Sequence, residues 1–164
     1  MSDDAELDFR PATEDDLPVM AEMVREAFDP VGKRLGIDRH NTPHFAAYET
    51  AESLREQLAR WNIRMFLLVV DGVAVGCGGW SPDAEGAPRG WLARIAVRPA
   101  WQGRGYGRMI VRRLEDELRR EGFTRVRLAH ADLHRFYERL GYRTMETKEM
   151  QSWGGTLTYT EKDL

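Results

Sequence analysis

A glycine-rich stretch at residues 102–108 has the residue types and spacing best suited to binding a phosphate group. It reads Gln102-Gly103-Arg104-Gly105-Tyr106-Gly107-Arg108. The three glycines leave few side chains between a ligand and the backbone N–H groups. An amphipathic helix is expected to begin at about Tyr106, and the first N–H groups of a helix lack intrahelical partners and carry partial positive charge. We therefore predict an anion-binding cradle made mainly of backbone N–H groups.

The spacing of these glycines excludes two better-known phosphate loops. A P-loop requires Lys and then Ser or Thr after its last glycine, where this chain has Arg108-Met109. The dinucleotide-binding fingerprint requires a third glycine three residues after the second, and this chain places Arg108 or Ile110 there. The stretch is therefore predicted to be a phosphate loop of a different kind, and the alternative interpretation is a tight turn before a helix.

The histidines are the other residues whose spacing raises the question of a site. His40 and His44 are four residues apart, as are His130 and His134. This spacing can put two imidazoles on one helical face, as metal sites need. Pro43 would interrupt the first helix and neither pair has a third ligand nearby, so no metal is predicted.

Strands and helices alternate along the chain and must position the glycine-rich stretch. Strands are expected at residues 7–9, 65–70, 73–80, 91–97, 124–128, 142–147 and 157–162. Helices are expected over residues 13–28, 45–61, 106–120 and 133–140, with apolar residues at spacings of three and four.

Two connections have clear turn or breaker signals. Asp71-Gly72 predicts a two-residue β-hairpin. Residues 29–43 contain Pro30, Gly32 and Gly36 and are expected to form a loop.

Length and composition favour one globular domain over residues 1–164. The chain has 42% hydrophobic and 31% charged residues, which is typical of a folded protein. A formal net charge of −3 argues against nucleic acid as a partner. There is no apolar run of membrane-spanning length, no signal peptide, and a single cysteine, Cys77, that reads as a core residue. We therefore expect a cytoplasmic protein with no membrane partner and no disulfide.

Three motifs resemble a known family. They are Gln102-x-x-Gly105-x-Gly107, then Val97-x-Pro99 before it, and Phe136-Tyr137-x-x-Leu140-Gly141-Tyr142 after it. Together they are similar to segments of the GNAT N-acetyltransferase superfamily. The resemblance implies an α/β (α+β) fold, with a mixed, mostly antiparallel sheet of about six to seven strands and about four helices. It also implies acetyl-CoA as co-substrate.

The resemblance also implies which residues bind the co-substrate. The backbone of Ile95, Ala96 and Val97 would contact the pantetheine arm and polarise the thioester carbonyl. The loop would hold the pyrophosphate, and two of its arginines would add charge-assisted contacts. The loop residues concerned are Gln102, Gly103, Arg104, Gly105, Tyr106, Gly107 and Arg108, with Arg104 and Arg108 as the arginines.

Tyr137 matches the tyrosine that superfamily members use as general acid toward the leaving sulfur. The alternative interpretation is an aromatic packing residue beside Phe136. The general base is unassigned, because the strand at 91–97 lacks the carboxylate that relatives often place there. His44, His130 and Glu49 are base candidates, each set against the alternative of a solvated bystander. His130 also stands where relatives carry an asparagine.

These observations predict an N-acetyltransferase that moves an acetyl group from acetyl-CoA to a primary amine by direct attack in a ternary complex. The acceptor stays open among small amines, antibiotics, peptide N-termini and protein lysines, because its contacts are expected from residues 29–50 and the C-terminal hairpin. A homodimer is also left open. Alternatives are another acyl-CoA donor and a non-catalytic sensor that binds CoA or acyl-CoA. A nucleic-acid binder is disfavoured by the carboxylates interleaved in the arginine-rich helix.

Overall fold

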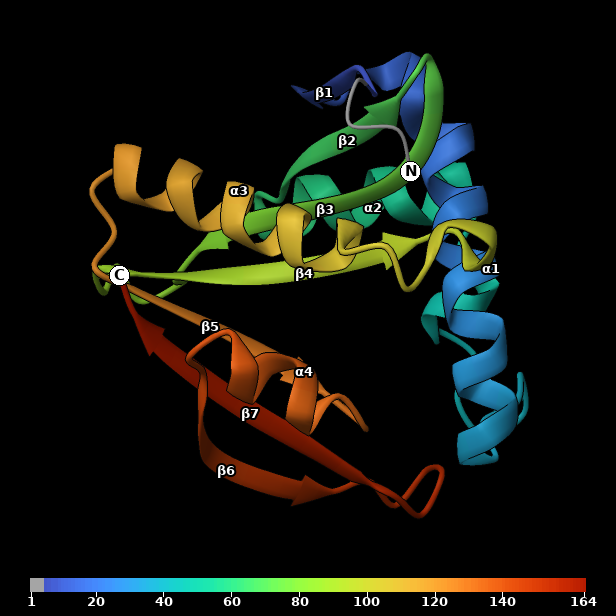
Figure 1. The fold of residues 1–164 in the computed structure, drawn as a ribbon. Helices are drawn as coiled ribbons and strands as arrows, with labels where there is room; N and C mark the ends of the chain where they lie inside the picture. The colour runs from blue at the N-terminus through green and yellow to red at the C-terminus, as the bar shows by residue number, and fades with distance from the viewer. Residues whose placement is uncertain (1–4) are drawn as a thin grey trace.

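In a computed structural model, which describes residues 5–164, the chain forms one seven-stranded sheet (Figure 1). Within residues 5–164 the strand order is β1-β2-β3-β4-β5-β7-β6, and only the β4–β5 pair is parallel. The mixed, mostly antiparallel sheet expected from the sequence is therefore confirmed. The strands are β1 (Leu7–Pro11), β2 (Arg64–Val70), β3 (Val73–Pro82), β4 (Arg89–Val97), β5 (Arg125–His130), β6 (Arg143–Glu149) and β7 (Thr156–Asp163).

Helices cover both faces of the sheet. Within residues 5–164 the α-helices are α1 (Leu17–Leu35), α2 (Ala51–Trp61), α3 (Tyr106–Arg120) and α4 (His134–Arg139). Short 3₁₀ turns are η1 (Glu14–Asp16), η2 (Ala46–Tyr48) and η3 (Pro99–Trp101). One core lies between the sheet and α3 with α4, and a second lies between the sheet and α1 with α2. The polypeptide thus forms three layers, with the sheet in the middle.

Helix α3 packs unusually close to the sheet, because small residues in the strands face its apolar side. Ile110, Leu114 and Leu118 are fully buried on that side, as their spacing predicts. A Cβ on Gly78 would lie 2.8 Å from Ile110 Cγ2, and one on Gly90 would clash with Leu118. The close approach fixes the N-terminus of α3 beside the C-terminal end of β4.

The parallel strands β4 and β5 separate part of the way along their length. Their ladder joins only residues 89–91 to residues 125–127. Beyond it β4 continues along β3 to Val97, and β5 continues along β7 to His130. Among the described residues, therefore, no strand pairs with the β5-facing edge of β4 after Trp91. This edge leaves backbone groups open to a ligand.

Helix α1 corrects the loop predicted at residues 29–43, since it continues through Pro30 to Leu35. Proline removes one intrahelical hydrogen bond. Apolar contacts offset that loss, because Phe28 packs edge-on against Phe45 at 6.0 Å between ring centroids. The helix ends at Gly36, which takes the left-handed conformation at φ 71°.

The second helix begins later than predicted, at Ala51 rather than near residue 45. Thr50 sets this start, because its Oγ1 accepts a hydrogen bond from the Ser53 N–H at 3.0 Å. Trp61, expected on the inner face, is 54% exposed. The Asp71-Gly72 hairpin is as predicted, with positive φ at both residues.

Candidate functional site

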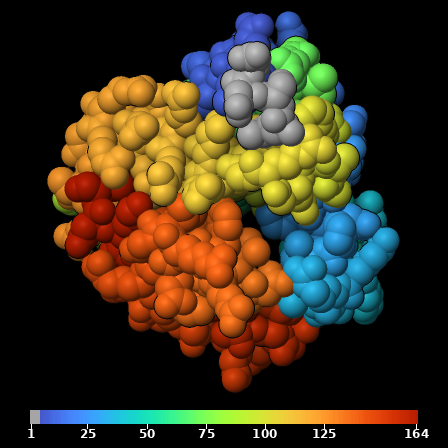
Figure 2. Space-filling view, in the orientation of Figure 1, coloured from blue at the N-terminus to red at the C-terminus, as the bar shows by residue number. Residues whose placement is uncertain are grey.

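A cavity of about 740 Å³ lies where β4 and β5 separate. Its walls come from the C-terminal half of α1, the end of β4, the loop into α3, and α4. Figure 2 shows the surface hollowed between α4, in orange, and the end of α1, in light blue. The predicted site residues that line it are Ile95, Ala96, Val97, Gln102, Gly103, Gly105, Tyr106, Gly107, Arg108 and Tyr137. Residues far apart in the sequence are thus brought to one cavity.

The loop at 102–108 wraps the end of β4 and presents the N-terminus of α3. The Gln102 side-chain amide donates to the Val97 carbonyl at 2.9 Å, which ties the loop to the strand. Gly103 and Gly105 have φ of 77° and 87°, a region that favours glycine. Gly105 is the N-cap of α3, so the first N–H groups of a 15-residue helix face the cavity end. This arrangement suits an anion such as a phosphate.

Several arginines give the cavity a positive rim. Arg108 lines it as predicted, and it is joined by Arg34, Arg112 and Arg139. Arg112 follows Arg108 by one helical turn, a spacing from which it could have been predicted. The guanidinium of Arg104 lies over the Trp101 ring, 4.9 Å from its centroid, outside the lining.

Arg34 links the two walls of the cavity. Its Nε donates to the Asp132 carboxylate at 2.8 Å, and its Nη2 contacts the same oxygen. Arg34 lies in the last turn of α1, and Asp132 lies in the loop between β5 and α4. The contact thus spans the gap between α1 and the α4 side of the cavity.

Tyr137 is the titratable side chain of the cavity wall that is best placed to donate a proton. It is 5% exposed and packs against Phe136, Tyr142 and His130. Burial raises the pKa of its hydroxyl, so the phenol stays protonated at neutral pH. None of the residues in 5–164 makes a hydrogen bond to this hydroxyl, which leaves it able to donate to a ligand.

His130 is poorly suited to act as a base. Its Nδ1 accepts a hydrogen bond from the Leu133 N–H at 3.1 Å, so the proton of the neutral ring sits on Nε2. Burial, helped by nearby His134, lowers its pKa and favours that neutral form. Its Nε2 is buried and has no partner among the described residues. The ring stacks on Tyr137 at 5.5 Å, which makes it a support for that side chain.

Glu49 contradicts the expectation of a solvated bystander, because it is only 3% exposed. One carboxylate oxygen accepts from Ser53 Oγ at 2.5 Å and Gln57 Nε2 at 3.1 Å. The other lies 3.3 Å from Arg94 Nε. With both oxygens engaged, Glu49 holds its neighbours in place. His44, the third base candidate, is exposed.

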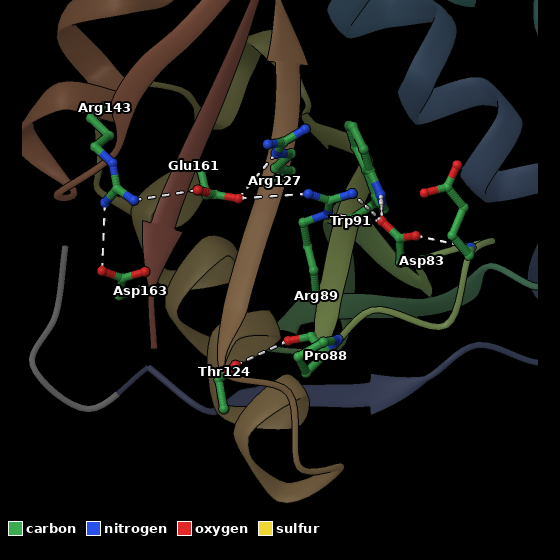
Figure 3. Close-up of polar contacts among 10 residues, drawn as sticks. Asp83, Pro88, Arg89, Trp91, Thr124, Arg127, Arg143, Glu161 and Asp163 are labelled. Atoms are coloured by element: carbon green, nitrogen blue, oxygen red, sulfur yellow. Dashed lines mark hydrogen bonds and ion pairs between the residues drawn. The ribbon is translucent and has the colours of Figure 1, made fainter.

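Buried carboxylates and their arginine partners stabilise the end where β4 and β5 are paired (Figure 3). Glu161 on β7 is nearly inaccessible and lies 3.1 Å from Arg127, 3.3 Å from Arg143 and 3.9 Å from Arg89. Arg89 also pairs with Asp83 at 2.6 Å. Hydrogen bonds from the Glu85 N–H, Arg89 and Trp91 hold the pKa of Asp83 below its usual range.

Neither a metal centre nor a membrane span is found in the described part of the chain. Residues 5–164 contain no group of three His, Cys, Asp or Glu side chains arranged to hold a metal ion. Over the same residues, no helix is both long and apolar enough to cross a membrane.

Comparisons with known proteins relate this chain to acyl-transferring enzymes. The family model described as "Acetyltransferase (GNAT) family" matches residues 22–142. A curated relative, an IAA acetyltransferase from Azospirillum brasilense, is 36% identical over 73 residues. That match spans 44% of this chain and 47% of the relative, so it reaches about half of the relative's length.

Solved structures share the fold. The PaiA N-acetyltransferase of Thermoplasma acidophilum, solved with coenzyme A, is 15% identical with a TM-score of 0.76, covering 97% of this chain and 99% of that one. An acetyltransferase from Thermus thermophilus is 22% identical with a TM-score of 0.73, covering 96% and 97%. The N-acetylglutamate synthase of Neisseria gonorrhoeae, solved with coenzyme A and N-acetyl-glutamate, is 24% identical with a TM-score of 0.72, covering 99% of this chain and 36% of that one.

Proposed function

Because the chain belongs to the acetyltransferase (GNAT) family, we propose that it moves an acetyl group from acetyl-CoA to a primary amine by direct attack in a ternary complex. One observation carries the proposal. The unpaired edge of β4 and the N-terminus of α3 open into the same cavity, which thereby joins a backbone-binding strand edge to an anion cradle.

The residues of the cavity fit the chemistry of acetyl-CoA. A pyrophosphate would bind the N–H groups of residues 103–108, and Arg108 and Arg112 would add charge. The amides of a pantetheine arm would pair with the backbone of Ile95, Ala96 and Val97, where β5 has moved away. The PaiA N-acetyltransferase and the N-acetylglutamate synthase, which share this fold, were both solved with coenzyme A, which supports this donor class.

The reaction requires an amine nitrogen to attack the thioester carbon, so that a C–N bond forms and the C–S bond then breaks. A backbone N–H of β4 would stabilise the carbonyl oxygen while it carries negative charge. Tyr137 would donate its proton to the thiolate that leaves, and the amine would lose its proton to solvent. An acceptor that arrives neutral needs no protein base, which agrees with the engagement of both oxygens of Glu49.

Thermal unfolding with and without acetyl-CoA tests the proposed binding site. At 100 times Kd the ligand should add about 2.7 kcal/mol, which corresponds to roughly 5 to 10 °C in Tm for a chain of this size. Gly105→Glu should abolish the shift, because it puts a carboxylate in the anion cradle. Gly122→Glu is the matched control, since Gly122 also has positive φ but follows the far end of α3. A shift that survives Gly105→Glu, or no shift in the folded wild type, would contradict the proposed site.

A non-catalytic sensor of CoA or acyl-CoA is the second candidate. It is favoured by the lack of any carboxylate in β4, whose sequence is RGWLARIAV. Release of free CoA thiol from acetyl-CoA, measured with an amine panel, separates the two functions. Turnover identifies the enzyme, and tight binding without turnover identifies the sensor.

A further inference from the structure

Arg94 occupies a strained position at the bulge of β4. Its φ is 54°, and the other non-glycine residues with positive φ in the described chain are Asn62 and Asp71. Asn and Asp adopt this conformation readily, whereas Arg rarely does. The register between β3 and β4 shifts at this point, between Cys77 and Gly79. Strained residues persist where the surrounding structure fixes them, and they concentrate at functional sites.

Arg94 and Ile95 point to opposite faces of the sheet, as neighbouring residues of a strand do. Ile95 packs in the α3 core and lines the cavity. Arg94 reaches the other face, where its guanidinium meets α2. Arg94 directly precedes Ile95, so its side chain leaves the strand next to the proposed thioester contact and on the opposite face of the sheet.

The guanidinium of Arg94 is fixed on one side and open on the other. Its Nε and Nη2 donate to Gln57 Oε1 at 3.1 and 2.5 Å, and Nε lies 3.3 Å from Glu49 Oε2. No residue within 5–164 accepts a hydrogen bond from Nη1, and the side chain is 24% exposed. The Nη1 end of Arg94 is thus a preorganised donor with no acceptor among the described residues.

Glu49 is the carboxylate that pairs with this guanidinium, and its acceptor oxygens are already engaged. Arg25 of α1 donates from Nη1 to the backbone carbonyl of Glu49 at 2.7 Å, which fixes the chain beside the Arg94 contact. That carboxylate is also saturated by Ser53 and Gln57. The Nη1 end of Arg94 therefore has no carboxylate of its own among the described residues, and its N–H donors suit a carboxylate oxygen.

We propose that Arg94 binds a carboxylate of the acceptor, so that the acceptor is a free amino acid whose amine is presented to the thioester. This inference rests on the proposed acetyl transfer, and it names the substrate class. The acceptor's carboxylate accepts a hydrogen bond from Nη1, while its neutral amine stays unbound and able to attack. Glu49 and Gln57 are positioning residues, since they act only through Arg94.

The test measures acetyl-CoA-dependent thiol release with free L-amino acids, each paired with its carboxamide, which keeps the amine and removes the negative charge. Because converting the carboxylate to an amide also lowers the pKa of the substrate's amine, kcat/KM is expressed per concentration of neutral amine. On that scale at least one amino acid should exceed its amide by about 10- to 100-fold, the loss expected for one hydrogen bond to a charged group. Arg94→Gln should bring that ratio close to one, and Arg94→Lys should restore it in part. Arg60→Gln, which removes an exposed arginine at the end of α2, should leave the ratio unchanged.

A second variant keeps the proposal testable if the Arg94 variants do not fold. Glu49→Gln retains Arg94 but loosens its support, so it should raise KM for the amino acid more than KM for the amide. The Tm shift with acetyl-CoA, recorded for each variant, shows whether the donor site is intact. If acetyl-CoA binds and the amides react as well as the amino acids, or no free amino acid reacts, the carboxylate site is overturned. If acetyl-CoA produces no shift in the wild type, the proposed function fails first.

Discussion

Glu161 should be essential for stability, because it is a nearly inaccessible carboxylate with three arginines around it. Its side chain is 2% exposed, and the nearest guanidinium nitrogens lie 3.1, 3.3 and 3.9 Å away. Removing one partner from a buried ionic group costs about 3–5 kcal/mol. Arg89 and Arg127 are each 21% exposed, so water can partly replace the lost contact. We expect Glu161→Gln to lower the free energy of unfolding by about 2–4 kcal/mol.

Urea unfolding at pH 7 measures this loss. An m-value equal to that of the wild type would confirm that the variant unfolds between the same native and denatured states. Asp163→Asn is the matched control, because Asp163 pairs with Arg143 at 3.6 Å but is 70% exposed. Its loss should stay within about 0.5 kcal/mol, as for other surface ion pairs. The reasoning is refuted if Glu161→Gln costs no more than Asp163→Asn, since burial would then carry no weight in this network.

Two further predictions concern catalysis and pH. Tyr137→Phe should lower kcat by about 100-fold, the lower end for general acid catalysis. The Tm shift with acetyl-CoA should be retained, and an unchanged kcat would remove Tyr137 from the mechanism. For Asp83, hydrogen bonds from the Glu85 N–H and Arg89 lower the pKa in the folded state. The carboxylate therefore stabilises the fold fully above its unfolded pKa of about 3.9, and this stabilisation is lost as the pH falls through the folded pKa. The stability difference between wild type and Asp83→Asn should be constant from about pH 5 to 8 and shrink below about pH 4. A difference that urea unfolding finds unchanged at the lowest pH would contradict this assignment.

The features that the sequence predicts well depend on local chemistry. The cavity loop is recognised by its glycines, because Gly103 and Gly105 need positive φ where other residues would be strained. The Asp71-Gly72 hairpin is recognised for the same reason. Helix α3 follows from its apolar stripe, in which Ile110 and Leu114 recur at the helical spacing.

The features that the sequence does not reveal depend on contacts between distant segments. Pro30 predicts a break, yet α1 continues because Phe28 packs on Phe45, a residue from another segment. The burial of Glu49 requires α2 and the bulge of β4 to meet, which no local pattern encodes. Glu161 meets Arg127 and Arg143 only because β7 inserts between β5 and β6 in that register.

The two ends of β4 have opposite requirements, and the sequence meets them with different residues. At one end Arg89 and Trp91 join the buried network that holds β4 to β5. At the other end, the bulge at Arg94 shifts the register between β4 and β3. This shift lies in the part of β4 that no longer pairs with β5. A strand that stayed paired on both edges would have no free backbone for a thioester. The ionic network therefore confines the separation of the strands to one end, and the strain at Arg94 is located where the backbone must be left open.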